Sequence, residues 1–317
     1  MRVLVTGATG YVGSRLIPEL LQAGHHVFAA VRREGALDDH PWAEDVTPRP
    51  FDIEDPELIR SGVFGMDAVI YLVHSMESED FVTKDREAAE RVAAACTEAG
   101  VQRIVYLSGL VPDGELSDHL GSRLQVEKVF LDSEVPSTVL RAAMVIGAGS
   151  TSFEILRRLT QRVPLTPIPA WMRHRLQPVS IEDVVHLIGR ALEGEPRNKH
   201  YDVGGDEVVS YPELLATIAE VMDVRRPQVI LPWAPRKPVG WLVARLTGMP
   251  TATVTSLVES LCHDMVCQED DVRRELAGPG HEFTPLVEAF ERSLDHRGAE
   301  GTSAVGDVQA AAATDPA

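Results

Sequence analysis

The sequence contains few cysteines and no long run of apolar residues. Three of its 317 residues are cysteines, Cys96, Cys262 and Cys267, and an odd, sparse set is typical of a reducing compartment. The stretch from Cys262 to Cys267 offers too few ligands, at no recognised spacing, for a metal site, so we expect buried thiols and no metal. No apolar run reaches about 18 residues, and no signal peptide precedes the first expected strand. We therefore expect a cytoplasmic protein without an integral membrane segment.

Basic residues are too few to balance the acidic ones. The chain has 30 Lys and Arg against 48 Asp and Glu, which gives a net charge of −18 and an isoelectric point near 5.0. This balance disfavours nucleic acid and anionic membranes as partners. It does not exclude a phosphorylated cofactor, because local charge decides that binding. The length fits two domains or one enlarged α/β domain.

A glycine-rich turn opens the chain. Residues 2–6 form a short apolar run that predicts a buried parallel strand, and Gly7, Gly10 and Gly13 follow before an amphipathic helix. The N–H groups of such a turn and of the helix start converge on one place, where a phosphate binds. An ordinary strand–loop–helix connection is the alternative. The position at the first strand of an alternating β/α pattern favours dinucleotide binding.

The spacing Gly-x-x-Gly-x-x-Gly, together with Thr6 and Tyr11-Val12, resembles the short-chain dehydrogenase/reductase superfamily, in its extended and atypical branches. Further matches lie at 71–76, 107–110 and 117–120. They resemble an NmrA-like, NAD(P)H-binding group of bacterial oxidoreductases that is also described as epimerase-like. The resemblance implies cofactor contacts from Thr9, Tyr11 and Val12 beside the three glycines.

The resemblance extends to about residue 295 and implies an α/β fold, a Rossmann-type doubly wound parallel sheet with a smaller, mostly helical C-terminal cap. We expect residues 1–146 to form the NAD(P)-binding domain, with 177–205 returning to the sheet. Residues 147–176 and 206–296 would form the cap around the substrate. Residues 297–317 hold almost no bulky apolar side chain, so we expect a disordered tail.

Two arginines after the second expected strand bear on the choice of cofactor. NAD-binding domains place an acidic residue there for the ribose 2′-hydroxyl, whereas an arginine accommodates a 2′-phosphate. This chain has Arg32 and Arg33, so we prefer NADP(H). Two solvated surface arginines are the alternative, and the nearby acids Glu34, Asp38 and Asp39 leave NAD(H) open.

The resemblance assigns further cofactor contacts to two other strand ends. Asp52 and Ile53 would lie beside the adenine. Leu72, Val73 and His74 occupy the turn that relatives place beside the cofactor's ribose. A histidine that is hydrogen-bonded at a strand end is the alternative for His74.

The expected reaction centre departs from the family's pattern. Ser108 occupies the place of the catalytic serine, which binds a substrate carbonyl. The Tyr-x-x-x-Lys pair that follows in the family lies on one helix face, but here His119 takes the tyrosine's place and Arg123 the lysine's. Arginine can hold a ribose hydroxyl but does not shift its pKa as lysine does. Histidine can transfer protons, or it is a surface residue of a protein that only binds.

Two functions remain after this departure. The first is an NADP(H)-dependent oxidoreductase that acts on a small carbonyl or hydroxyl compound, with Ser108, His119 and Arg123 as catalytic residues. The second is a cofactor-bound redox sensor or assembly protein without catalysis, which the lost tyrosine motivates. A sugar-nucleotide epimerase is less favoured because that chemistry also relies on the tyrosine. The sequence leaves the substrate open, and the oligomeric state open between a monomer and a homodimer.

Overall fold

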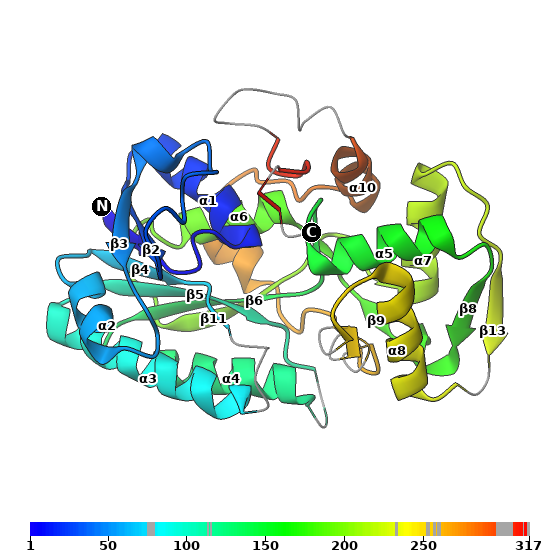
Figure 1. The fold of residues 1–317 in the computed structure, drawn as a ribbon, viewed down its shortest axis with the longest axis horizontal. Helices are drawn as coiled ribbons and strands as arrows, with labels where there is room; N and C mark the ends of the chain where they lie inside the picture. Colours follow the sequence, from blue (N-terminus) through cyan, green and yellow to red (C-terminus); the bar gives the residue numbers. More distant parts are fainter. Residues whose placement is uncertain are drawn as a thin grey trace.

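The computed structural model describes residues 1–74, 80–112, 114, 116–231, 234–251, 254–255, 258, 261–295, 307–312 and 314–315. A sheet with helices on both faces forms one part of the molecule, and helices with short strands form the other (Figure 1).

The strands are β1 (Arg2–Val5), β2 (His26–Val31), β3 (Thr47–Pro50), β4 (Ala68–Tyr71), β5 (Arg103–Gly109), β6 (Ser137–Ala142), β7 (Val145–Ile146), β8 (Thr166–Pro169), β9 (Arg175–Leu176), β10 (Val179–Ser180), β11 (Lys199–Val203), β12 (Val209–Ser210) and β13 (Gln228–Leu231). The helices are α1 (Tyr11–Gln22), η1 (Ala43–Asp45), α2 (Pro56–Val63), α3 (Phe81–Ala99), α4 (Asp118–Leu131), α5 (Thr151–Arg162), η2 (Ala170–Arg173), α6 (Ile181–Arg190), α7 (Tyr211–Val221), α8 (Arg236–Thr247), η3 (Val272–Leu276) and α10 (Leu286–Leu294).

Seven of these strands form the central sheet of the described part, in the order β11-β6-β5-β4-β1-β2-β3. Each neighbouring pair is parallel. The chain moves outward from β1 to β3, then returns past β1 and builds β4, β5, β6 and β11 on the other side. This order confirms the predicted Rossmann-type doubly wound sheet.

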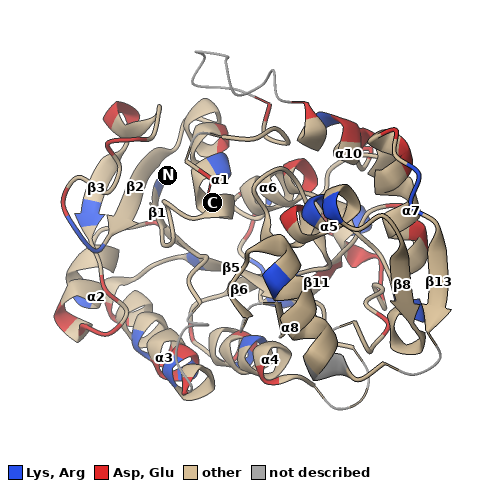
Figure 2. Ribbon diagram, turned by 45° about the vertical axis from the view of Figure 1, so that its right-hand side comes forward, with Lys and Arg blue, Asp and Glu red and all other residues tan. Residues whose placement is uncertain are grey.

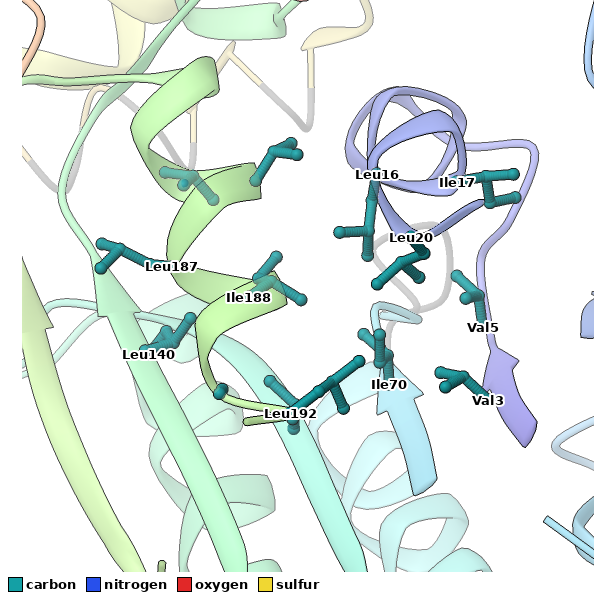
Figure 3. Close-up of a cluster of buried hydrophobic side chains, with 14 of the residues drawn as sticks. Val3, Val5, Leu16, Ile17, Leu20, Ile70, Leu140, Leu187, Ile188 and Leu192 are labelled. Carbon is teal, nitrogen blue, oxygen red and sulfur yellow. The ribbon is translucent and has the colours of Figure 1, made fainter. Parts of the chain in front are cut away.

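Both faces of the sheet are buried, which explains the continuous apolar character of its inner strands. Val3 and Val5 of β1 pack in one cluster with side chains of α1 and α6, as Figure 3 shows for Leu16, Leu20 and Ile188. Leu4, between the two valines, belongs to a second cluster on the opposite face. That cluster is formed with residues of α2, α3 and α4. β1 is apolar on both of its faces because each face packs against a layer of helices.

The second part of the molecule has its own core. Phe153 of α5, Leu214 of α7 and Phe290 of α10 are completely buried in one cluster. A smaller cluster joins α8 to the following segment through Ala244, Val254 and Val258. β8 and β13 pair in parallel beside these helices. This part is mostly helical and lies against the carboxyl end of the sheet through the segments after β6 and β10.

The C-terminal residues differ from the prediction of a disordered tail. Residues 307–312 and 314–315 are ordered against the fold, while 297–306 lie outside the described residues. Gln309 is fully buried, and its amide donates to the carbonyl oxygens of Ile146 and Ala289 at 2.8 and 3.2 Å. The prediction rested on the lack of bulky apolar side chains. Polar contacts hold this segment instead, and composition does not reveal them.

A buried ion pair anchors the end of this segment. The guanidinium of Arg15, on α1, donates to both carboxylate oxygens of Asp315 at 2.6 and 2.8 Å, and the two side chains are only 5% and 9% exposed. Arg15 also donates to the carbonyl oxygens of Ala148, Val308 and Ala310. The C-terminal segment thus joins α1 to the beginning of α5.

We expect Asp315→Ala to destabilise the protein, because it leaves the buried guanidinium of Arg15 without its anion. Breaking a buried pair costs about 3–5 kcal/mol, whereas Glu57→Ala, which breaks an exposed pair with Arg60, costs at most about 1 kcal/mol. Equilibrium urea unfolding measures both. Adding Arg15→Leu to Asp315→Ala should recover part of the loss. Equal midpoints for the wild type and Asp315→Ala would show that the segment does not dock.

Candidate functional site

The turn between β1 and α1 leaves no room for a side chain at its glycine positions. Gly7 has a φ of +68°, and a Cβ on Gly13 would lie 2.2 Å from the carbonyl oxygen of Gly7. A Cβ on Gly10 would lie 3.2 Å from the same oxygen. Gly10 is the N-cap of α1, and no side chain caps the helix there. The first N–H groups of α1 are therefore left without a competing side-chain acceptor, as an anion site requires.

This turn lies where the strand order of the sheet reverses. β1 pairs with β2 on one side and with β4 on the other, and ligands of doubly wound sheets bind at such a point. The hydroxyl of Thr6 donates to the carbonyl oxygen of Ile70 at 3.2 Å and accepts from the N–H of Leu72 at 3.1 Å. The glycine turn and the turn at Leu72–His74 are thereby fixed beside each other. Thr9, Tyr11 and Val12 belong to the same turn and helix start.

Arg32 and Arg33 follow β2 directly, and both are exposed. Within the described part of the chain, neither guanidinium forms an ion pair. The loop behind them is held by Trp42, a residue that the sequence did not single out. Trp42 is buried, and its indole N–H donates to the carbonyl oxygen of Ser14 on α1 at 3.0 Å. Two uncommitted cations therefore lie at the end of the strand next to the glycine turn.

Asp52 and Ile53 lie in a tight turn between β3 and α2. One carboxylate oxygen of Asp52 accepts from the N–H of Glu54 at 2.9 Å, and the carbonyl oxygen of Ile53 accepts from Arg91 at 3.0 Å. Asp52 thus stabilises its own turn, and its second oxygen is left for a ligand. The predicted adenine contact remains a prediction.

Ser108, His119 and Arg123 line one cavity of about 270 Å³ at the carboxyl end of β5. Tyr11 and Val12, from the glycine turn, line it as well. Ser108 is 3% exposed, and its Oγ has no hydrogen-bond partner in the described part of the chain. The phenol of Tyr106 is near this hydroxyl, but the two do not meet hydrogen-bond geometry. A buried hydroxyl without a partner at a cavity wall is suited to bind a polar atom of a ligand.

Arg123 orients His119. Its Nε donates to Nε2 of His119 at 3.3 Å, and its Nη1 donates to the carbonyl oxygen of Leu107 at 3.2 Å. Nε2 of His119 is therefore an acceptor, which leaves the proton of the neutral ring on Nδ1. Burial, followed by the positive charge of Arg123 and then the neighbouring His74, lowers the pKa of His119 to about 3. The imidazole is neutral at physiological pH.

His74 shares this electrostatic environment. Although His74 is an exposed residue, desolvation by the surrounding protein and then the charge of Arg123 lower its pKa to about 4. His119 and Arg123 therefore replace the family's tyrosine and lysine with a neutral imidazole and a guanidinium, and His74 adds a second neutral imidazole nearby. Arg123 carries the positive charge of this group.

Another part of the cavity wall comes from the second part of the molecule, where the sequence predicted a cap but no individual wall residue. Met144, Tyr211, His263 and Met265 contribute, and the hydroxyl of Tyr211 lies 3.8 Å from the sulfur of Met144. His263 is adjacent to Cys262, which we had noted only for its thiol. No local pattern marks these residues, because they reach the cavity from separate segments.

An apolar space of about 70 Å³, which we call the apolar extension, lies next to this cavity beneath α8. Ser152, Tyr211 and Leu261 line both spaces. The other walls of the extension come from α5, η2 and α8 and are apolar. They include Ile155, Leu156, Leu159, Trp171, Met172, Val239 and Val243.

A larger cavity of about 900 Å³ lies on another face, between α1, α6 and α10. Its cations already have partners, since Arg273 pairs with Asp206 and Arg292 with Glu182, each at 2.6 Å. None of the predicted site residues lines it. We therefore place the functional site at the smaller cavity.

No cluster of three or more His, Cys, Asp or Glu side chains in the described part could hold a metal ion. Cys96 and Cys262 are buried, and Cys267 is half-buried. No helix among the described residues is both long and apolar enough to cross a bilayer.

Comparisons with known proteins agree with the glycine turn and the sheet. A model of an NAD(P)H-binding family matches residues 7–162. The chain is 27% identical over 231 residues to the mitochondrial NADH dehydrogenase (ubiquinone) 1 alpha subcomplex subunit 9 of Arabidopsis thaliana, which covers 69% of this chain and 56% of that protein. The chain thus spans about half the length of this curated relative.

Solved structures share the fold. A nucleoside-diphosphate-sugar epimerase of Staphylococcus aureus is 18% identical with a TM-score of 0.75, over 92% of this chain and 100% of that one. The NADPH-dependent quinone oxidoreductase of Escherichia coli, in complex with NADPH, is 20% identical with a TM-score of 0.74, over 91% and 98%. The family model bears out the predicted NAD(P)H-binding resemblance, and the solved structures confirm the Rossmann-type fold.

We expect the ring of His119 not to titrate between about pH 8 and about pH 5, because its pKa of about 3 lies far below the usual value of about 6.5. The unfolded chain binds this proton below about pH 6.5, so the site contributes less stability as the pH falls from there. Proton NMR of the imidazole, assigned with His119→Asn, checks this.

Arg123→Gln should raise the pKa of His119, since it removes a neighbouring positive charge. Lys128→Gln, on an exposed position of the same helix, is the matched control and should leave the titration unchanged. A midpoint near pH 6.5 in the wild type would contradict the neutral, buried histidine.

Proposed function

Because residues 7–162 match a model of an NAD(P)H-binding family, we propose that the protein is an NADP(H)-dependent oxidoreductase that acts on carbonyl compounds with an apolar body. The observation that carries this proposal is the unpartnered hydroxyl of Ser108, in a cavity that the glycine turn and the Arg123–His119 pair share. The hydroxyl is a hydrogen-bond donor held ready for a substrate oxygen.

The residues around the glycine turn fit such a cofactor. A Cβ at Gly7, Gly10 or Gly13 would crowd neighbouring backbone, so the glycines let the turn close tightly onto the start of α1. The N–H donors of that helix start would bind a pyrophosphate. Arg32 and Arg33 would bind the 2′-phosphate, since both are exposed and unpaired in the described part. When bound, the nicotinamide supplies or takes up a hydride.

The protein's own groups would polarise the carbonyl. Ser108 donates its hydroxyl proton in a hydrogen bond to the substrate oxygen, and Nδ1–H of His119 is the second donor. The guanidinium of Arg123, behind His119, stabilises the negative charge that develops on this oxygen. His119 acts as a neutral donor and not as an imidazolium. The proton that completes a reduction to the alcohol therefore comes from water.

The cavity favours an apolar substrate. Its walls include Leu107, Leu120, Met144, Leu176 and Met265, and the extension beneath α8 is lined by aliphatic and aromatic side chains. Removal of apolar surface from water would supply the binding energy. The Escherichia coli neighbour is named for quinones, which are apolar carbonyl compounds.

A non-catalytic sensor or assembly protein is the second candidate. The absence of the Tyr-x-x-x-Lys pair favours it, and the Arabidopsis relative is a subunit of a larger complex. Such a protein would bind the cofactor, distinguish its oxidised from its reduced form and turn over no substrate.

Arg32→Asp should weaken NADPH binding by about 10–100-fold and change NADH binding by less than about threefold, because a charge-assisted bond to the 2′-phosphate is lost. Isothermal titration calorimetry with both nucleotides measures this. Arg60→Asp, another exposed arginine far from the glycine turn in sequence, is the control. Binding of NADH alone would assign the protein to the NAD class, and binding of neither would refute the cofactor proposal.

Ser108→Ala should lower kcat by about 100-fold, as expected when one donor to a developing oxyanion is removed, without weakening NADPH binding. NADPH oxidation with a panel of quinones and aromatic aldehydes provides the assay. Ser133→Ala, at the far end of the α4 layer, is the control. Unchanged turnover in Ser108→Ala would show that Ser108 does not donate to the substrate oxygen. Tight NADPH binding without any turnover would favour the sensor.

A further inference from the structure

The charge of this acidic chain is distributed very unevenly. Residues 155–181 and 224–258 together contain ten Lys and Arg and no Asp or Glu, although the whole chain has a net charge of −18. These two stretches, which we call the basic lobe, include most of α5 together with η2, β8, β13 and α8. Figure 2 shows Lys and Arg on α5 and α8, whereas Asp and Glu gather on helices such as α10.

The basic lobe also carries most of the large apolar side chains that are exposed in the described part of the chain. Nine large apolar side chains are exposed in the described part of the chain, and six of them belong to the lobe. They are Leu165 (49% exposed), Val229 (42%), Ile230 (59%), Leu231 (38%), Trp241 (56%) and Leu242 (46%). Scattered single residues of this kind are ordinary, but six in one lobe mark an interaction surface.

The geometry of β13 explains why these side chains are uncovered. β13 pairs with β8, and its consecutive residues Val229, Ile230 and Leu231 are all exposed. Successive residues of a strand point to opposite faces, so neither face of the strand is buried there. Figure 1 places β8 and β13 at the edge of the molecule opposite β3.

α8 differs from an ordinary surface helix because its outer face, like its inner face, carries apolar side chains. Gly240, Ala244 and Thr247 face inward, toward α5 and the small apolar cluster. Trp241, Leu242 and Arg245 are exposed on the outer side, where a solvated helix normally carries polar residues. The guanidinium of Arg245 lies 6.0 Å from the centre of the Trp241 ring. Aromatic, aliphatic and cationic groups thus share one outward face.

Carboxylates from flanking segments neutralise only part of the lobe. Glu154 pairs with Arg157 and Arg158, and Asp264 pairs with Arg175. Arg173, Arg225 and Arg245 are exposed and have no carboxylate partner among the described residues. The lobe that presents the apolar side chains therefore also carries exposed positive charge.

We propose that the basic lobe docks on the surface of an anionic lipid bilayer. Apolar side chains on a projecting strand pair and a helix would enter the headgroup region, while the surrounding arginines contact lipid phosphates. A nucleic acid would not bury Ile230 or Leu242, and the acidic remainder of the molecule is repelled by the same membrane. The net charge disfavours anionic membranes for the molecule as a whole, but the local charge reverses this preference at the lobe.

Docking in this orientation goes beyond the proposed reaction and does not depend on it. It would bring the apolar extension close to the bilayer, because Val239 and Val243 of α8 line that space. An apolar substrate dissolved in the membrane would then have a short path to the cavity.

Flotation of the full chain with vesicles tests the proposal. Binding should be at least about tenfold greater on vesicles of phosphatidylcholine and phosphatidylglycerol than on phosphatidylcholine alone, and should weaken as salt is raised. Trp241→Ser/Leu242→Ser and Arg225→Glu/Arg245→Glu should each reduce binding by about tenfold. The matched control is Phe64→Ser, which removes an apolar side chain that is 73% exposed outside the lobe and should bind as the wild type does.

Thermal unfolding midpoints equal to that of the wild type will establish that the variants fold. Bromine-labelled lipids provide a second readout. They should quench the tryptophan fluorescence of the wild type, and this quenching should be lost in Trp241→Phe if Trp241 enters the bilayer. Absence of binding to anionic vesicles would overturn the proposal. Equal loss in Phe64→Ser and in the lobe variants would overturn it too, as would a lobe that captures a protein or DNA but no lipid. NADPH titration of the same variants keeps this result separate from the proposed enzymatic function.

Discussion

The close approach of α1 to β1 is the constraint on which the rest of the structure depends. No side chain fits at Gly13, because a Cβ there would collide with the carbonyl oxygen of Gly7. This contact allows Leu16 and Leu20 to reach Val3 and Val5 in the core (Figure 3). It also directs the free N–H groups of α1 to the point where the strand order reverses. Packing and anion binding therefore have the same cause.

The proposed reaction centre shows how replacing two residue types, a tyrosine by His119 and a lysine by Arg123, changes the available chemistry. In the family's pattern a lysine lowers the pKa of a tyrosine. Here burial, and then the charge of Arg123, lower the pKa of His119. The effect is the opposite of activation as an acid, since the neutral imidazole holds its proton on Nδ1. The positive charge stays on the guanidinium, which cannot lose it at physiological pH. In the proposed reaction the site would stabilise negative charge and donate hydrogen bonds, and solvent would supply the proton.

Much of the fold and part of the candidate site could be predicted from local sequence. The apolar run of β1, the three glycines and the alternating pattern predict the doubly wound sheet, because each reports a local steric or burial requirement. Ser108, His119 and Arg123 were identified by their places in a known pattern, and the structure brings them to one cavity. Tyr211, His263 and Met265 could not be identified, since their proximity depends on how separate segments pack. The ordered contacts of Gln309 and Asp315 were hidden for the same reason.

By itself, the sequence determined the class of fold, the anion-binding turn and the overall negative charge, all of which follow from residue types and short spacings. Only the tertiary structure decided which histidine is neutral, which hydroxyl has no partner and which charges are neighbours. Burial and electrostatic interaction act between residues that are close in space and far apart in the chain. The basic lobe shows this clearly, because two stretches more than 40 residues apart combine into one lobe that is basic and exposes apolar side chains on an acidic protein.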